Sequence, residues 1–256
     1  MFQHHGPSRS DRQNRVLAGY LAFIGGFVNS AGFVLIGTFT SHVTGNVGRL
    51  ANDLAAREAD AAAAAFTMIA AFFLGSFVAS MIVESNLSGR HAHAYGTALM
   101  LEGGLLLLFT VVTSSAGIVH ARLNDMQAAI LCAAMGMQNS LVTRLSGAVV
   151  RTTHLTGVIT DVGIEAARWF RWWRGQLSAR VHVKLSVGAS IAEKPLVPKI
   201  ALLSMIAAAF MVGAIAGAAS ATILRHAAML VPSAAVIACG AYAFWSGAKA
   251  AHDSRK

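Results

Sequence analysis

Six long apolar segments restrict the folds that this chain can adopt. They cover residues 16–37, 61–83, 95–114, about 125–142, 200–224 and 227–247. The first is 22 residues long, which exceeds the core of a signal peptide. As a helix it would reach about 33 Å, enough to cross the hydrocarbon layer of a bilayer. The segments therefore predict an all-α, polytopic membrane protein with six transmembrane helices.

The composition agrees with a location in the lipid bilayer. Hydrophobic residues make up 55% of the chain and charged residues only 12%, whereas about a quarter of the residues of a soluble domain are charged. The two cysteines both lie within apolar segments, without the spacing of metal ligands. We therefore expect no catalytic residues, no cofactor and no metal site, and we expect that the protein is not an enzyme.

A short motif occurs twice in the chain. Residues 40–45 read Thr-Ser-His-Val-Thr-Gly and residues 152–157 read Thr-Thr-His-Leu-Thr-Gly. Each copy follows a Gly-x-x-Asn-Ser sequence, at 26–30 and 136–140, and each precedes a pair of small residues four positions apart. These pairs are Gly75 with Ala79 and Gly213 with Gly217. Three landmarks in the same order indicate an internal duplication, with repeat one at 16–114 and repeat two at 125–247.

Three spans in each repeat have a geometric consequence. Because three is odd, the second repeat must enter the membrane from the side opposite to the first. The repeats are then related by a pseudo-two-fold axis in the membrane plane, as in many transporters. We thus expect two inverted three-helix repeats in a single membrane domain at 16–247.

Lysine and arginine counts predict the orientation. With a cytoplasmic N-terminus, 16 of these residues lie in cytoplasmic segments and four lie outside, so we expect both termini in the cytoplasm. Residues 1–15 should be a disordered basic segment, about 175–199 a cytoplasmic insertion, and 248–256 a cytoplasmic tail. Tryptophans alternate with arginines at 168–174, a mixture that favours the lipid headgroup layer over nucleic acid.

The two motifs predict a solute site. His42 and His154 occupy equivalent positions, each followed by a new helix for which Thr44 or Asn46, and Thr156, are the expected N-caps. Free N–H groups at such helix ends bind an anion or a polar solute. Alternatively, the motifs are only capped helix starts at the two membrane surfaces. Whether they dip into the membrane stays open.

Polar residues within the apolar segments extend this candidate site. Amides at membrane depth either join helices or line a cavity. The predicted solute-binding residues are Asn29, His42, Thr44, Asn46, Gln138, Asn139, Thr153, His154 and Thr156. Glu102 lies within the third span, where a carboxylate marks a proton pathway or a buried pair. Arg49 and Asp161 occupy equivalent positions with opposite charges, and they are the candidate gate.

The duplicated elements resemble those of a known family. Thr-Gly-Asn-Val-Gly-Arg-Leu-Ala at 44–51, Gly-Met-Gln-Asn-Ser at 136–140 and Arg-Thr-Thr-His-Leu-Thr-Gly at 151–157 resemble the YoaK family over residues 16–247. Its members are small multi-pass proteins of the bacterial inner membrane, and their domain has no assigned function. The resemblance implies that same location and supplies no site residues.

These features lead to one hypothesis and two rivals. The hypothesis is a small-solute transporter or permease in the lipid bilayer, which takes a small polar or anionic solute at the interface of the repeats. The first rival is a structural or interaction protein of the membrane, in which the polar groups only hold helices together. The second is a membrane-embedded hydrolase, for which residue types exist but no specific spacing does.

Overall fold

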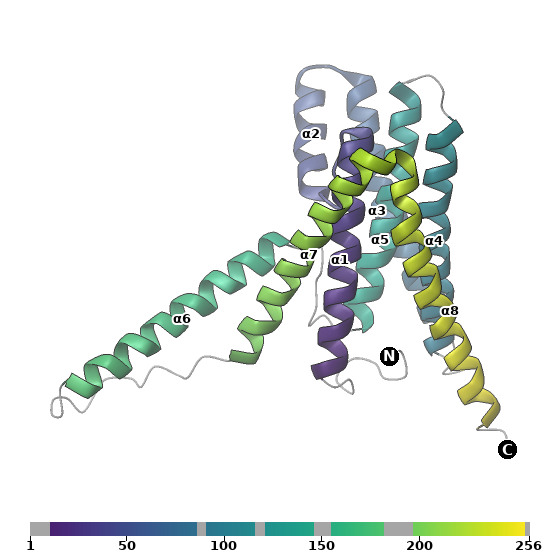
Figure 1. Ribbon diagram of the computed structural model, residues 1–256. Helices are drawn as coiled ribbons and strands as arrows, with labels where there is room; N and C mark the ends of the chain where they lie inside the picture. Colours follow the sequence, from purple (N-terminus) through teal and green to yellow (C-terminus); the bar gives the residue numbers. More distant parts are fainter. Residues whose placement is uncertain (1–10, 86–90, 116–120, 146–154, 182–196, 254–256) are drawn as a thin grey trace.

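The structure is a computed structural model that describes residues 11–85, 91–115, 121–145, 155–181 and 197–253 (Figure 1). All regular elements in these ranges are helices. They are α1 (Asp11–Ile36), α2 (Val43–Ala55), α3 (Ala59–Glu84), α4 (His91–Ser115), α5 (Ala121–Leu145), α6 (Leu155–Val181), α7 (Val197–Leu224), the 3₁₀ helix η2 (Arg225–Met229) and α8 (Leu230–Asp253).

Each of the six apolar segments lies largely within its own long helix, so the all-α prediction is confirmed. In the described part of the chain, four stretches are long and apolar enough to cross a membrane: Ala18–Ile36, Ala59–Glu84, Ala92–Ser114 and Ile200–Ser246. The last covers most of α7 and most of α8. The helix α5 falls outside these stretches because amide and charged side chains interrupt its apolar sequence.

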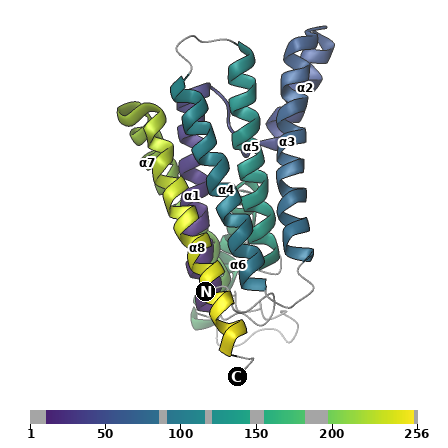
Figure 2. The same cartoon turned by 90° about the vertical axis from the view of Figure 1, so that its right-hand side faces the viewer.

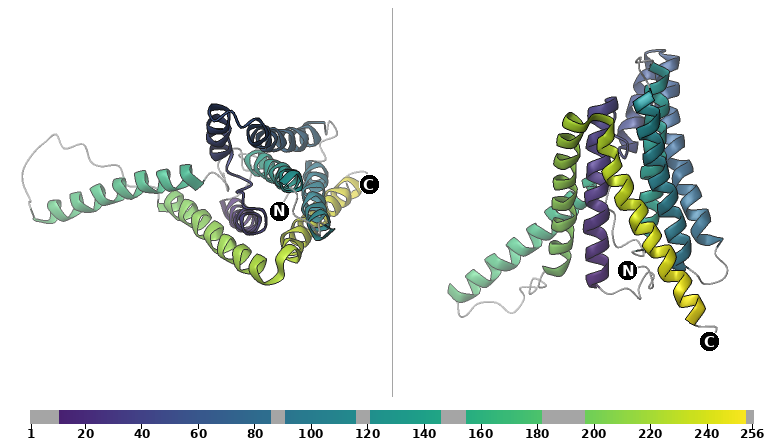
Figure 3. Two further views of the ribbon diagram at one scale, coloured as in Figure 1. Left: turned by 90° about the horizontal axis from the view of Figure 1, so that it is seen from above. Right: turned by 45° about the vertical axis from the view of Figure 1, so that its right-hand side comes forward.

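The long helices form an upright bundle. Four of them stand in a row in which α7 packs on α1, α1 on α5, and α5 on α3, while α4 and α8 pack together beside α5 (Figures 2 and 3). The helix α1 begins and α8 ends at the same end of the bundle (Figure 2). The short helix α2 lies beside α3 at the opposite end, and α6 leaves the bundle obliquely (Figure 1).

Glycines allow the neighbouring helices in this row to approach closely. A Cβ atom on Gly26 of α1 would lie 2.9 Å from the carbonyl carbon of Phe210 on α7, and one on Gly136 of α5 would lie 2.9 Å from that of Phe72 on α3. Real Cβ atoms do not show contacts under 3.0 Å, so only glycine fits these crossings. Three further crossings of this kind join Gly75 to Ala133, Gly213 to Phe23 and Gly217 to Phe27.

The helices α4 and α8 meet in a similar way. Gly96 and Gly240 face each other's carbonyl oxygens, at 2.7 Å and 2.9 Å from where their Cβ atoms would lie. Farther along the same pair, the Ser233 hydroxyl donates a hydrogen bond of 2.9 Å to the Gly103 carbonyl oxygen. Small residues and a buried serine bond are the features that join helices in lipid, where burial of apolar surface provides little driving force.

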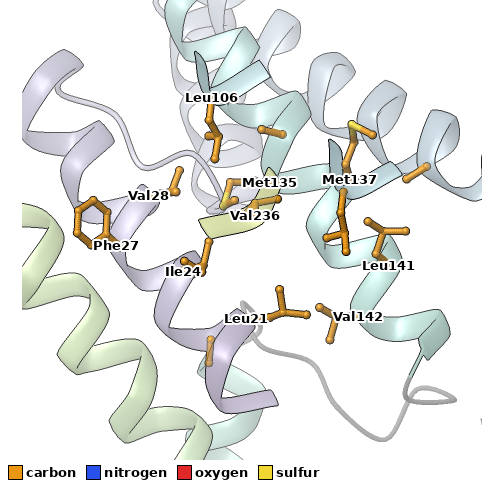
Figure 4. Close-up of a cluster of buried hydrophobic side chains, with 14 of the residues drawn as sticks. Leu21, Ile24, Phe27, Val28, Leu106, Met135, Met137, Leu141, Val142 and Val236 are labelled. Atoms are coloured by element: carbon orange, nitrogen blue, oxygen red, sulfur yellow. The ribbon is translucent and has the colours of Figure 1, made fainter. Parts of the chain in front are cut away.

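The interior of the bundle is apolar, and so is much of its outer surface. Buried side chains of α1, α4, α5 and α8 meet in the core, among them Leu21, Val28, Leu106, Met135 and Val236 (Figure 4). The outer faces of α3 and α7 present further large apolar side chains, including Phe66, Phe73, Met211 and Ile215. Such extensive exposed apolar surface is typical of a protein surrounded by lipid.

Two boundaries differ from the sequence prediction. The helix α1 begins at Asp11, so residues 11–15 of the segment expected to be disordered are helical. The insertion expected as a loop at about 175–199 is helical at both ends, because α6 continues to Val181 and α7 begins at Val197. The helices α1 and α7 begin before their apolar segments because polar residues continue a helix as readily as apolar ones. The remainder, 182–196, lies outside the described residues.

Candidate functional site

The first copy of the motif folds back along α1. The helix α1 ends at Ile36, and the next residue, Gly37, has a φ of 72° and an N–H that donates a 2.8 Å bond to the Phe33 carbonyl oxygen. Glycine adopts this left-handed conformation without strain. Beyond the turn, the ring of Phe39 stacks on Phe33 at a centroid distance of 4.3 Å. The chain after α1 thus reverses its direction and descends beside the helix that it has left.

Hydrogen bonds fix the lower end of this descending segment. The backbone N–H of Ser41 and its hydroxyl both donate to Oδ1 of Asn29, at 3.2 Å and 3.1 Å. Asn29 lies seven residues before the end of α1 at Ile36, a distance of about 10 Å along the helix. The first motif therefore dips into the bundle, to the level of Asn29 on α1.

The helix α2 starts from the bottom of this dip. It begins at Val43 and ends at Ala55, and the chain then turns through Arg57, with a φ of 61°, into α3. The N-cap is His42, which makes no side-chain capping bond, so the prediction of Thr44 or Asn46 as the cap was wrong. Because the Asn29–Ser41 bonds position the preceding loop, α2 starts without the usual hydroxyl or amide cap.

The candidate residues of the first motif differ in exposure. Asn46 is buried on α2, whereas His42 and Thr44 are exposed. Thr40, a member of the motif that we did not include among the site residues, is 1% exposed, and its hydroxyl has no hydrogen-bond partner among the described residues. Because Thr40 is the first residue of the duplicated motif, the sequence could have indicated it as a site residue.

The second copy of the motif is described only in part. Thr153 and His154 lie outside the described residues. The helix α6 begins at Leu155, so Thr156 lies inside its first turn, where it is exposed, and the prediction of Thr156 as the cap was wrong. Leu155 occupies the same place in its motif as Val43, and the two helices therefore begin at equivalent residues.

Two polar side chains in the core make no hydrogen bond to any described residue. Glu102 of α4 and Gln138 of α5 are both 0% exposed. Neither oxygen of Glu102 and neither polar atom of the Gln138 amide has a hydrogen-bond partner among the described residues. An unpaired buried amide costs about 1–3 kcal/mol, and an unpaired buried carboxylate costs more. A group that destabilises the fold in this way is a candidate for function.

The surroundings of Glu102 come from three helices. Tyr20 of α1 and Cys239 of α8 lie within electrostatic reach of its carboxyl group, and Leu99 and Leu106 precede and follow it in the buried stripe of α4. Tyr20 and Cys239 were absent from our predicted site. Their proximity arises from the crossing of separate helices, for which the sequence around Tyr20 and Cys239 carries no local signal.

Other polar groups join helices. Asn29 holds the descending segment, as described above. The hydroxyls of Ser80 on α3 and Ser140 on α5 lie 2.7 Å apart, and Arg144 donates to Ser80 at 3.2 Å and to Glu84 at 2.6 Å. Asn139, beside these residues, is half-buried, and its backbone carbonyl oxygen accepts a bond from Thr143 within α5 itself. The contacts of Ser80, Ser140 and Arg144 thus join α3 to α5.

The two candidate gate residues, Arg49 and Asp161, lie on α2 and α6. Arg49 lies 3.6 Å from Asp53, one turn farther along α2, and Asp161 is exposed on α6. The Arg49–Asp161 gate stays a prediction. No group of three or more His, Cys, Asp or Glu side chains close enough to hold a metal occurs in the described ranges.

Comparison with known proteins gives the family of the chain. No curated protein and no solved structure matches it. A family model described as "Protein of unknown function (DUF1275)" matches residues 17–243. This agrees with the uncharacterised family that the resemblance implied, although the YoaK name itself remains only a resemblance. The matched region covers nearly the whole bundle, and the chain therefore belongs to this family of unknown function.

Proposed function

We propose that this protein is a membrane permease for a small polar or anionic solute, built from two inverted repeats. The observation that carries the proposal is the burial of two polar side chains, Glu102 and Gln138, that have no hydrogen-bond partner in the part of the chain that the structure describes. A structural membrane protein would gain stability by replacing both with apolar residues. A permease needs such groups, because they bind a solute or a proton when the bundle opens.

The close helix crossings support the inverted repeats. An offset of 110 residues takes Gly26 to Gly136, and an offset of 138 takes Phe72 to Phe210. When each residue is replaced by its counterpart in the other repeat, the crossing of Gly26 with Phe210 becomes the crossing of Gly136 with Phe72. In both crossings a Cβ atom on the glycine would lie 2.9 Å from the carbonyl carbon of the phenylalanine. They also exchange the crossing of Gly213 with Phe23 for that of Gly75 with Ala133.

The direction of the helices supports the same symmetry. When the two repeats are exchanged, α4 takes the place of α8 and α8 takes the place of α4. The crossing of these two helices at Gly96 and Gly240 is therefore its own counterpart. Gly103 lies near Ser233 in this pair, so the two helices run antiparallel. An axis perpendicular to the helices relates antiparallel helices, as the inverted repeats of transporters require. The pairing of α2 with α3 likewise corresponds to that of α6 with α7.

The dip of the first motif provides a solute-binding element. A short helix that starts inside a membrane bundle directs free N–H groups and a partial positive charge into the interior. In α2 these are the groups after His42, where no side-chain cap is formed. The buried Thr40 hydroxyl and the buried Asn46 amide lie on either side of this helix start. We assign the solute to this end of α2 and its counterpart in α6.

Glu102 is assigned the transfer of a proton coupled to the solute. In the closed bundle its carboxyl group is fully covered, and burial of its ionised form would be very costly. When the bundle opens to one side, Glu102 takes up a proton, and when it opens to the other side, Glu102 releases it. Both termini are assigned to the cytoplasmic side of the bacterial inner membrane, following the lysine and arginine counts.

Proton uptake by vesicles tests this function. The full-length protein is reconstituted into liposomes that contain the pH dye pyranine, and small amino acids, carboxylates and polyols are added one at a time. At least one solute should acidify the interior faster than in protein-free vesicles. Glu102→Gln keeps the size and polarity of the side chain but cannot exchange a proton, so solute-driven acidification should fall at least about tenfold.

Glu58→Gln is the matched control, because Glu58 is exposed at the start of α3 and makes no capping bond with its side chain. Its acidification rate should equal that of the unchanged protein. If no solute in the panel acidifies the vesicles, the permease proposal is overturned in favour of the structural rival. If Glu102→Gln acidifies them as fast as Glu58→Gln, the assignment of Glu102 is wrong.

A further inference from the structure

The second half of α6 has no counterpart in the first repeat. The helices α2 and α6 begin at equivalent residues, but α2 has 13 residues and α6 has 27. The first 13 residues of α6, which match the length of α2, end at Ala167. Up to that point α6 packs against the bundle, and its buried residues Val158 and Glu165 lie in this half. Farther along, α6 extends away from the other helices (Figure 3), and residues 168–175 are exposed except for the half-buried Trp172.

This extension has an apolar face that no other element of the described structure covers. Trp169, Phe170 and Trp173 are 43–50% exposed. Their spacing places them on one side of the helix, where the two tryptophan rings stack at a centroid distance of 6.3 Å and the phenylalanine ring lies 6.2 Å from Trp173. Three large exposed aromatic rings in one row are unfavourable in water and favourable at the boundary of a bilayer.

Arginines lie beside and opposite this aromatic face. Residues 168–175 contain three arginines and no acidic residue. Arg168 lies 3.0 Å from Glu165, and the guanidinium of Arg174 lies 5.9 Å from the centre of the Phe170 ring. Arg171 and Arg174 are exposed. Their side chains are long enough to rise from the aromatic layer to the level of lipid phosphates.

We propose that residues 168–175 of α6 form a binding surface for anionic phospholipids. The aromatic rings enter the boundary between headgroups and acyl chains, while Arg171 and Arg174 bind the negative headgroups. Charge complementarity decides between the candidate occupants, since a second copy of the chain would bring arginines against arginines. Anionic lipids of the cytoplasmic leaflet attract basic residues in this way. This surface does not depend on the proposed transport of a solute.

Tryptophan quenching by brominated lipids tests the surface. The chain has four tryptophans, and Trp245→Phe leaves only Trp169, Trp172 and Trp173, all in α6. The full-length protein in vesicles should be quenched by brominated phosphatidylglycerol more strongly than by the same fraction of brominated phosphatidylcholine. Arg171→Gln with Arg174→Gln should reduce this preference by up to about fivefold for each arginine removed.

Two control variants make the result specific. Arg171→Lys with Arg174→Lys keeps the charge and should keep most of the preference. Arg57→Asn with Arg225→Asn removes two exposed arginines outside α6 and should leave the preference unchanged. Equal quenching by the two lipids would overturn the proposal. A third outcome is that neither lipid quenches the tryptophans and that their emission changes with the density of protein in the vesicles. This outcome would mean that a second copy of the chain covers the aromatic face, and it would also overturn the proposal.

Discussion

The crossing of Gly136 with α3 allows a quantitative prediction. In Gly136→Ala the new methyl group would lie 2.9 Å from the carbonyl carbon of Phe72. An ordinary contact begins at 3.4 Å, so α3 and α5 must separate by at least half an ångström, and by more to accommodate the carbonyl oxygen. Overpacking of this size costs about 1–3 kcal/mol.

Gly104→Ala is the matched control, because no atom lies within 4 Å of the position of its Cβ. Alanine forms helix better than glycine, so this variant should be unchanged or more stable by up to about 1 kcal/mol. The free energy of unfolding, measured by titration with SDS from mild detergent micelles, should therefore differ by about 1–4 kcal/mol between the two variants. By the symmetry of the crossings, Gly26→Ala should match Gly136→Ala. Equal stability of Gly136→Ala and Gly104→Ala would refute the close approach of α3 and α5.

Two further substitutions test single contacts by the same titration. Asn29→Leu removes the acceptor of both Ser41 bonds, so unfolding should become easier by about 1–3 kcal/mol, and stability equal to that of the unchanged protein would mean that these bonds do not hold the dip. Ser233→Ala removes the buried bond to Gly103 and should cost about 0.6–1.7 kcal/mol, as polar bonds between membrane helices do; a gain in stability would contradict that bond.

The sequence predicted the helices well because each carries its own long apolar pattern. The expected span at 200–224 and the helix α7 end at the same residue, Leu224. The polar residues Glu102 and Gln138 were also identified from sequence, because polar groups at membrane depth are conspicuous in apolar surroundings. The glycine pairs at positions such as Gly75 were visible as small residues four positions apart, although their partners were not.

The dip of the first motif could not be predicted from the sequence. It depends on Phe39 and Ser41 meeting Phe33 and Asn29, and such contacts between separate stretches leave no periodic pattern. The same reason explains why the caps at Thr44 and Thr156 were predicted wrongly. A local rule expects a hydroxyl or amide at a helix start, whereas here tertiary bonds position the loop before α2.

The central claim is that the two repeats face opposite ways across the membrane. Thiol labelling tests it directly in a background without Cys132 and Cys239. The variants are Arg57→Cys, at the turn after α2, and Gly175→Cys, in the extension of α6. An impermeant maleimide is applied to intact spheroplasts and to inside-out vesicles. The account predicts labelling of Arg57→Cys only in spheroplasts and of Gly175→Cys only in inside-out vesicles, and labelling of both variants from the same side would contradict it.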